Sequence, residues 1–149
     1  MKVKLLFIVF ICGISFRLLA QANSDPSMII QKCIDLPSLH AHYPTQPDGV
    51  PEYLYAVNNN NFLNNNIDVN RFGTKLNIVP ISFILENKIT SYFNFKEIHI
   101  DATKAIVDLQ YSFIENELKK SISILLNFEK VENSWVIIDK KFKEDQNEK

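Results

Sequence analysis

The chain has 149 residues, of which 46% are hydrophobic and 22% charged, and its formal net charge at pH 7 is −1. All charges among its first 22 residues are basic, so the remaining 127 residues hold 13 basic and 17 acidic residues, a net charge of −4. A mildly acidic chain with scattered basic residues has no electrostatic reason to bind nucleic acid or anionic lipid, and its length suffices for one domain with one core.

The first 22 residues have the three-part pattern of a secretory signal peptide. Two lysines form a positive start, residues 5–16 form an apolar stretch, and small alanines follow near the end. Arg17 interrupts the apolar stretch well before the roughly twenty residues that a membrane-spanning helix needs. We therefore expect residues 1–22 to be cleaved, residues 23–149 to form a single domain, and the protein to be periplasmic or secreted from a bacterium.

A short helix is predicted at the start of this domain. Ser24 or Asp25 can cap its N-terminus, Pro26 suits the first helical position, and Pro37 lies beyond its end. Cys33 is the one cysteine left after processing, so no intramolecular disulfide can form and the fold must rest on its core. The apolar residues recur at spacings of three and four and would share one buried face: Ile29, Ile30, Cys33 and Ile34.

Two histidines, His40 and His42, fall in the proline-rich segment 36–52, which is predicted to be irregular. In an extended chain they would lie on the same side. Imidazole and thiolate are suitable ligands for zinc or copper, so the pair could hold a metal together with Cys33 or Asp35. The alternative is two exposed loop histidines, because no fourth ligand occurs at a recognisable spacing.

Aromatic residues supply the candidate contact residues for a partner. A strand is predicted over residues 53–57, before a loop rich in asparagine. Tyr43, Tyr53 and Tyr55 could contact a ligand, because aromatic side chains combine a large area with a polar end, and Phe62 would lie at the loop tip. Ordinary strand and core packing is the alternative for Tyr53 and Tyr55.

The middle of the chain predicts a strand over residues 75–79, a short helical turn over 82–88 and a strand over 90–100. His99 alternates with isoleucines in the last of these strands and should face away from them.

Three further strands end the chain. Apolar and polar residues alternate over residues 105–113 and 121–129, as in strands with one buried face. A connection at Glu132 and Asn133 leads into a third strand beginning at Trp135, and asparagine accepts the positive φ that a tight hairpin needs. Both faces of that third strand are apolar, which suits a central strand of a sheet.

Three patches in this region, at residues 105–111, 123–130 and 133–139, resemble the terminal strands of small secreted bacterial domains of the cystatin-like and NTF2-like type. The last strand of such domains often carries Trp-x-Ile. The resemblance implies an α+β fold in which one N-terminal helix packs on a curved antiparallel sheet of about five to seven strands. Such domains include ligand binders, inhibitors, immunity proteins and a minority of enzymes, so the resemblance implies fold more than function.

Common catalytic motifs are missing from the sequence, including GxSxG, a glycine-rich phosphate loop, HExxH and CxxC. We therefore expect a non-catalytic binding module without a cofactor, whose ligand is an unknown protein or small molecule. It would use the hollow between helix and sheet, or the loops at 36–52 and 58–72. One alternative is a periplasmic immunity protein or inhibitor that acts on a partner protein. Another is a small NTF2-like hydrolase or isomerase with a pocket histidine: His40, His42 or His99.

Overall fold

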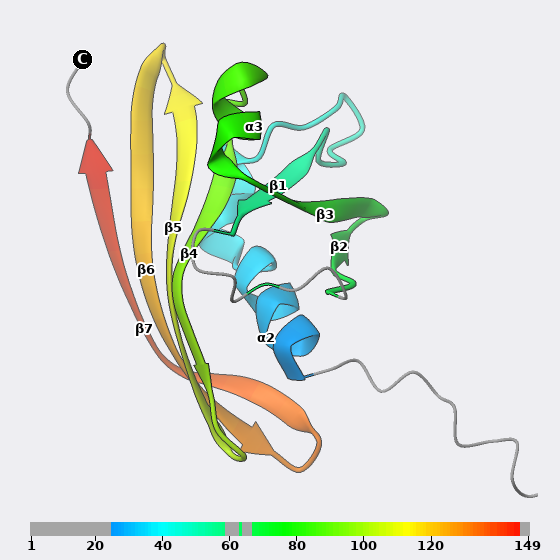
Figure 1. Cartoon of the computed structure of the whole chain (residues 1–149), viewed down its shortest axis with the longest axis vertical. Coiled ribbons are helices and arrows are strands. Elements are labelled where there is room, and N and C mark those ends of the chain that lie inside the picture. The colour runs from blue at the N-terminus through cyan, green and yellow to red at the C-terminus, as the bar shows by residue number, and fades with distance from the viewer. Residues whose placement is uncertain (1–24, 59–62, 64–66, 147–149) are drawn as a thin grey trace, which may run out of the picture.

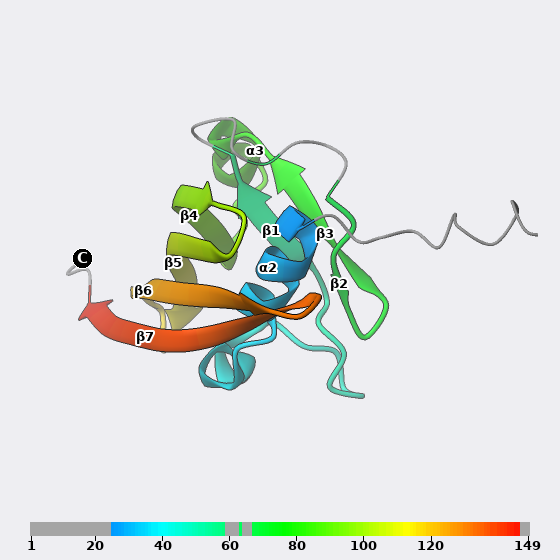
Figure 2. The ribbon, with the colours of Figure 1, turned by 90° about the horizontal axis from the view of Figure 1, so that it is seen from below.

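The computed structural model describes residues 25–58, 63 and 67–146. Seven strands form one mixed sheet in the order β2-β3-β1-β4-β5-β6-β7, which curves like half a barrel (Figures 1 and 2). The strands are β1 (Leu54–Val57), β2 (Asn70–Arg71), β3 (Thr74–Val79), β4 (Tyr92–Ile100), β5 (Lys104–Glu115), β6 (Leu118–Val131) and β7 (Ser134–Gln146). Few helices accompany them, so the architecture agrees with the predicted α+β class.

Three short helices complete the described part of the chain: α2 (Asp25–Ile34), the 3-10 helix η1 (Pro37–His42) and α3 (Ile81–Glu86). The helix α2 lies on the concave side of the curved sheet (Figure 2). Four of its apolar residues have no exposed surface, which agrees with their helical spacing: Ile29, Ile30, Cys33 and Ile34. No helix in the described ranges is long and apolar enough to cross a membrane.

Some predicted features lie outside the described residues. These are the signal peptide over residues 1–22, the alternative cap Ser24, and most of the asparagine-rich loop with Phe62.

The sheet is not purely antiparallel, which corrects the expectation from the sequence. Strand β1 lies between β3 and β4 and pairs with both of them in parallel. The chain passes from β3 to β4 through α3, and such a crossover lets two strands run in the same direction. Strand direction depends on this long-range connection, which the local alternation of apolar and polar residues does not encode.

The strands β4 to β7 form an antiparallel meander whose inner side carries the core. The largest fully buried side chains are mostly aromatic and fill the space between this sheet and α2: Phe93, Phe95, Tyr111, Phe113, Phe128 and Trp135. Neighbouring rings contact one another, as in the pair Phe93 and Tyr111, whose centroids are 4.7 Å apart. The concave face is therefore packed with side chains.

Strand β7 is an edge strand, so its prediction as a central strand is wrong. Trp135 is fully buried on the inner side, whereas Val136 and Ile138 are exposed on the outer side. The apolar residues on the outer face of β7 thus form an exposed surface patch, and no other part of the described structure covers that face. Lysines further along, at Lys140, Lys141 and Lys143, place charge on this open edge, which opposes pairing with other chains.

Two hairpin turns of the meander contain residues with positive φ, and none of these residues is glycine. In the hairpin between β6 and β7 it is Glu132, with φ 56°, and not Asn133 that takes the left-handed conformation. In the hairpin between β5 and β6, Asn116 and Glu117 both do so, with φ 52° and 66°. Two successive positive φ values give the turn whose twist matches that of the flanking strands.

Candidate functional site

The helix η1 brings the predicted histidines and Tyr43 into the fold. Its segment was expected to be irregular, but Pro37 starts a 3-10 helix, since proline has a helical φ and needs no partner for an N–H in the first turn. Residues three apart share a side of such a helix, so His40 and His42, two apart, point to different neighbours. The expectation that they lie on the same side is therefore wrong.

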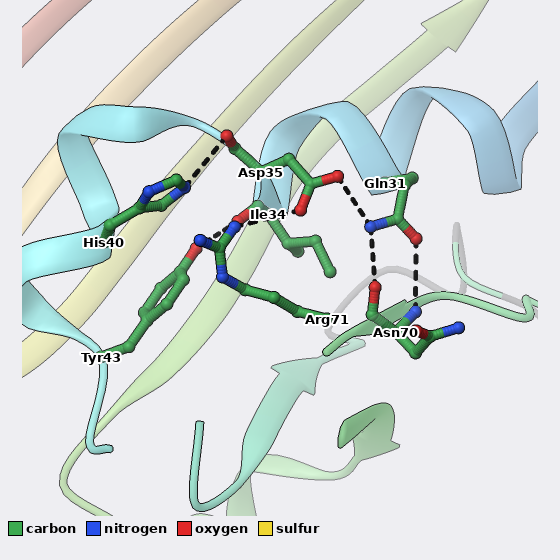
Figure 3. Close-up of polar contacts among 7 residues, drawn as sticks. All are labelled: Gln31, Ile34, Asp35, His40, Tyr43, Asn70 and Arg71. Carbon is green, nitrogen blue, oxygen red and sulfur yellow. Dashed lines mark hydrogen bonds and ion pairs between the residues drawn. The ribbon is translucent and has the colours of Figure 1, made fainter. Parts of the chain in front are cut away.

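His40 faces the end of α2 (Figure 3). Its Nε2 lies 3.1 Å from the backbone carbonyl oxygen of Asp35, and its ring centroid is 6.1 Å from that of Tyr43. Since a carbonyl oxygen only accepts, Nε2 carries a proton in this contact. His40 thus helps to fasten η1 to the preceding turn.

Tyr43, a predicted contact residue, is buried with 6% of its surface exposed. Its hydroxyl donates a 2.6 Å hydrogen bond to the carbonyl of Ile34, the last residue of α2 (Figure 3). That carbonyl belongs to the last turn of the helix, where no backbone N–H is in place to bind it. Burial raises the pKa of Tyr43 far above its ordinary value, which keeps the phenol protonated as a donor.

Arg71, on the edge strand β2, adds an ion pair to this cluster. Its guanidinium lies 3.1 Å from Asp35 Oδ1 and 5.5 Å from the Tyr43 ring centroid. Gln31 Nε2 donates to Asp35 Oδ2 over 2.9 Å and to the carbonyl of Asn70 over 2.8 Å, while the Asn70 N–H donates to Gln31 Oε1 over 3.3 Å. These hydrogen bonds and the ion pair together join α2 to β2 (Figure 3).

His42 lies in an open cleft of about 210 Å³. This η1 cleft is formed where η1 meets the end of β5 and the residues before β4, and its lining residues are Ala41, His42, Tyr43, Pro44, Thr90, Ser91, Phe113, Ile114 and Glu115. The His42 ring lies against the Phe113 ring, with 4.2 Å between centroids. The histidine therefore has an apolar neighbour on one side and the open cleft on the other.

An acid, Glu115, lies in the same cleft as His42. Its carboxylate forms an ion pair with Lys120, whose side chain is only 15% exposed. The hydrogen bond from Lys120, together with its charge, lowers the pKa of Glu115, and the charge of His42 when protonated acts in the same direction. Glu115 is therefore ionised at neutral pH and gives the cleft a local negative charge.

Hydroxyl groups form another wall of the η1 cleft. The Tyr111 hydroxyl donates to the backbone carbonyl of His42 over 3.2 Å, so Ser91 donates its own proton to Tyr111 in the hydrogen bond that joins them. Burial raises the pKa of Tyr111 above its ordinary range. Tyr53 reaches the cleft indirectly, through a hydrogen bond of 3.0 Å between its hydroxyl and Thr90 Oγ1.

The remaining predicted residues lie elsewhere. Tyr55 is half-buried under α3, with its ring 5.6 Å from that of Phe83 and 5.3 Å from that of Tyr53. His99 faces away from its isoleucine neighbours, as predicted, and its Nε2 is 3.3 Å from Asp101 on the outer side of the sheet. The structure therefore brings His42, Tyr43 and, through Thr90, Tyr53 together, but not His99.

The structure separates the residues of the predicted metal site. Asp35 lies beside His40, but Cys33 has no exposed surface, and burial raises the pKa of its thiol far above the ordinary value. Within the described ranges, no three side chains of His, Cys, Asp or Glu are grouped so that they could hold a metal ion. The described structure therefore does not bring the two histidines together around one metal position.

A second cleft, of about 300 Å³, adjoins the first and shares Thr90 and Ile114 with it. This α3 cleft is lined by Ile84, Leu85, Lys88, Ile89, Thr90, Tyr92, Ile114 and Lys119. Sequence analysis missed it, although one signal was present: Ile114 follows Phe113 and so puts an apolar residue on the polar face of β5. In the structure the Ile114 side chain is half-exposed and lines this cleft.

The chain matches no protein-family model, no curated protein sequence and no solved structure.

Proposed function

We propose that the protein is an exported, non-catalytic binding module that holds a partner protein at one end of the molecule, which we call the hairpin end and define by the η1 cleft and the α3 cleft. The observation that supports this most is the exposure of large apolar side chains there: Leu85 is 68% exposed and Ile114 50%. Neighbouring exposed apolar residues beside a cleft are typical of surfaces that bind other proteins.

The size of the clefts favours side chains of a partner over an enclosed small molecule. Their volumes of about 210 and 300 Å³ lie at or below the lower end of the range for pockets that enclose drug-sized ligands, about 300–1,000 Å³. Both clefts are open to solvent, and the concave side of the sheet is filled with aromatic rings. Clefts of this size suit the anchor residues that supply most of the binding energy in protein interfaces.

The fold supports a narrower assignment to the cystatin-like and NTF2-like type. A helix, α2, occupies the hollow of a curved sheet (Figure 1). The last strand carries the buried Trp135 as its second residue. The parallel pairing of β1 departs from the all-antiparallel sheet of that type. The charged, apolar and small-residue parts of residues 1–22 support export to the periplasm or the medium.

Two other functions remain as alternatives. An immunity protein or inhibitor would use the same hairpin end to cover the site of a partner, and small size, acidity and the export pattern favour it. A hydrolase or isomerase would use His42 as a general base, and its place beside Glu115 in an open cleft favours that role. Replacing His42 by Gln separates them, since it should abolish catalysis but only weaken the binding of a protein partner, to which the α3 cleft also contributes.

Native mass spectrometry of the exported full-length gene product, combined with cross-linking in the producing bacterium, tests the proposal. We expect one mature mass that is the same under native and denaturing conditions, and protein cross-links from a photoreactive residue at Ile114. The matched control position is Ile138, a similarly exposed isoleucine on β7. A small molecule lost on denaturation, or equal cross-linking from both positions, would contradict the proposal.

A further inference from the structure

The α3 cleft combines an apolar floor with positive charge. Isoleucine and leucine side chains from α3, from the turn after it and from β5 form the floor, and the only charged lining residues are Lys88 and Lys119. No aspartate or glutamate is among the residues that line it. The charged residues that line this cleft are therefore all positive, although acids outnumber bases in the whole chain.

Neither Lys88 nor Lys119 forms an ion pair with any residue that the structure describes. Lys120, which follows Lys119 in β6, does form ion pairs. Lys120 points to the other side of β6, where it pairs with Glu115 and lies 3.8 Å from Glu144. The two lysines of the α3 cleft therefore have free ammonium groups beside exposed apolar surface.

The backbone holds Lys88 at the rim of the cleft. Lys88 has φ 52° just after α3, the position that glycine usually takes at a helix end. Its N–H donates to the carbonyl of Leu85 over 3.3 Å, and the N–H of Ile89 donates to the carbonyl of Ile84 over 2.9 Å. Both bonds are those of the Schellman motif, and Ile84 and Ile89, which hold the positions of its usual apolar contact, both line the cleft. The base of the lysine side chain is thus fixed relative to the apolar floor.

We infer that the α3 cleft binds an acidic segment of the partner protein that carries an apolar side chain between its carboxylates. The apolar side chain would cover Leu85 and Ile114, and the carboxylates would lie at Lys88 and Lys119. Opposite charges across an interface select the partner and steer its approach, while the apolar contact supplies binding energy. A membrane surface is the poorer occupant, since lipid-binding segments gather four or more basic residues and this cleft has two.

This inference rests on the proposed function and assigns the chemistry of the partner. The probe is a synthetic peptide of alternating Glu and Leu, added to the mature full-length chain while amide chemical shifts are followed by NMR, which detects weak binding. Two control peptides replace every Glu by Lys, or every Leu by Ser. We expect shifts centred on Leu85, Lys88 and Ile114 with the first peptide alone, and weaker binding as salt is raised.

The protein variants sharpen the test. Charge reversal of both lysines, Lys88→Glu with Lys119→Glu, should weaken binding of the Glu and Leu peptide by about tenfold or more, since it turns two attractions into repulsions. The matched control is Lys141→Glu on the edge strand β7, which should leave binding unchanged. Circular dichroism of both variants should match that of the unaltered protein.

Three results would overturn the inference. The Lys and Leu peptide could shift the same amides equally, the double reversal could leave binding unchanged, or oleate could bind at the cleft while the peptide does not. In the last case the ligand is an acyl chain with a carboxylate.

If cross-links to a protein from Ile114 persist in any of these cases, the proposed function stands and the acidic segment alone is wrong. If the peptide binds but no protein cross-links form, the proposed function fails by itself.

Discussion

The indole Nε1 of Trp135 donates a hydrogen bond of 3.0 Å to the carboxylate of Asp25, which joins the first turn of α2 to the last strand of the chain. Lys130 donates to both oxygens of the same carboxylate, over 2.8 and 2.9 Å, and its ammonium lies 5.4 Å from the Trp135 ring centroid. One acid thus fastens the helix to the final hairpin, and a negative charge in the first turn is also favoured by the helix dipole.

Replacing Asp25 by Ala should lower the free energy of unfolding by about 1–3 kcal/mol, because the fully buried Trp135 loses the acceptor for its N–H. Urea denaturation followed by the fluorescence of Trp135, the single tryptophan, measures this. The control is Asp68→Ala, whose carboxylate lies 3.7 Å from Lys75 with both side chains well exposed and should cost less than about 1 kcal/mol. Equal losses in the two variants would contradict the assigned role.

The same contact predicts how stability depends on pH. Hydrogen bonds from Lys130 and then Trp135 lower the pKa of Asp25 below its ordinary value of 3.8. The charged carboxylate therefore stabilises the folded state fully above that value, and the contribution is lost as the pH falls through the lower folded value. In the Asp25→Asn variant this part of the loss of stability at acid pH should be absent. Urea titrations at a series of acid pH values measure the free energy of unfolding of both proteins. The prediction is wrong if this free energy falls in parallel for the variant and the unaltered protein as the pH is lowered.

Gln31 should control local opening of the edge strand β2. Its side-chain amide exchanges two hydrogen bonds with the backbone of Asn70, as a neighbouring strand would. In Gln31→Ala the amide of Asn70 loses its acceptor, so its hydrogen exchange should accelerate while amides of β5 stay protected. Gln46→Ala, in an exposed turn, is the control. Unchanged exchange at Asn70 would show that β2 is held by other contacts.

Glycine at position 132 should stabilise the protein. Glu132 has φ 56°, a conformation that costs a residue with a Cβ roughly 1–2 kcal/mol and glycine little. We expect Glu132→Gly to raise the free energy of unfolding by about 0.5–1 kcal/mol, after the greater freedom of glycine in the unfolded chain is allowed for. Asn133→Gly, at the neighbouring position without a positive φ, should not stabilise. If both variants were stabilised, the effect would not come from the positive φ at position 132.

Cys33 should react only when the protein unfolds. It has no exposed surface, and burial raises the pKa of its thiol far above the ordinary value, so thiolate is scarce in the folded state. It is the single thiol of a chain prepared without residues 1–22, and its labelling by a disulfide reagent should be slow in buffer and fast in denaturing urea. Rapid labelling under native conditions would mean that α2 detaches from the sheet.

Parts of the fold with one buried face could be predicted from the sequence. The spacing of isoleucines in α2 and the alternation in β5 and β6 reflect local geometry, and the structure has these elements within a few residues of the predicted ranges. The parallel direction of β1 and the edge position of β7 could not be predicted, because both depend on partners distant in sequence. The turn at Glu132 was misassigned for another reason: the hairpin register, and not residue preference, selects which position takes positive φ.

The candidate site was predictable only in part. Residue type pointed to His42 and Tyr43, and both line the η1 cleft. Nothing near them in sequence indicates Glu115 or Ile114, which the antiparallel meander brings from some seventy residues away. The α3 cleft likewise joins the end of α3 to three strands, β4, β5 and β6, so Lys88 and Lys119 come to line one cleft only in the folded chain.

The position of β1 between β3 and β4 bears on how the chain reaches this structure. Hairpins β4–β5, β5–β6 and β6–β7 join neighbours in sequence and can form early, whereas β1 needs both of its later partners before it has any place in the sheet. The chain emerges from its N-terminus onward, both in synthesis and on the proposed export route, so α2 emerges well before Lys130 and Trp135, the residues that fasten it. The N-terminal half must therefore wait unfolded, and we expect the completed C-terminal meander to be the template on which it closes.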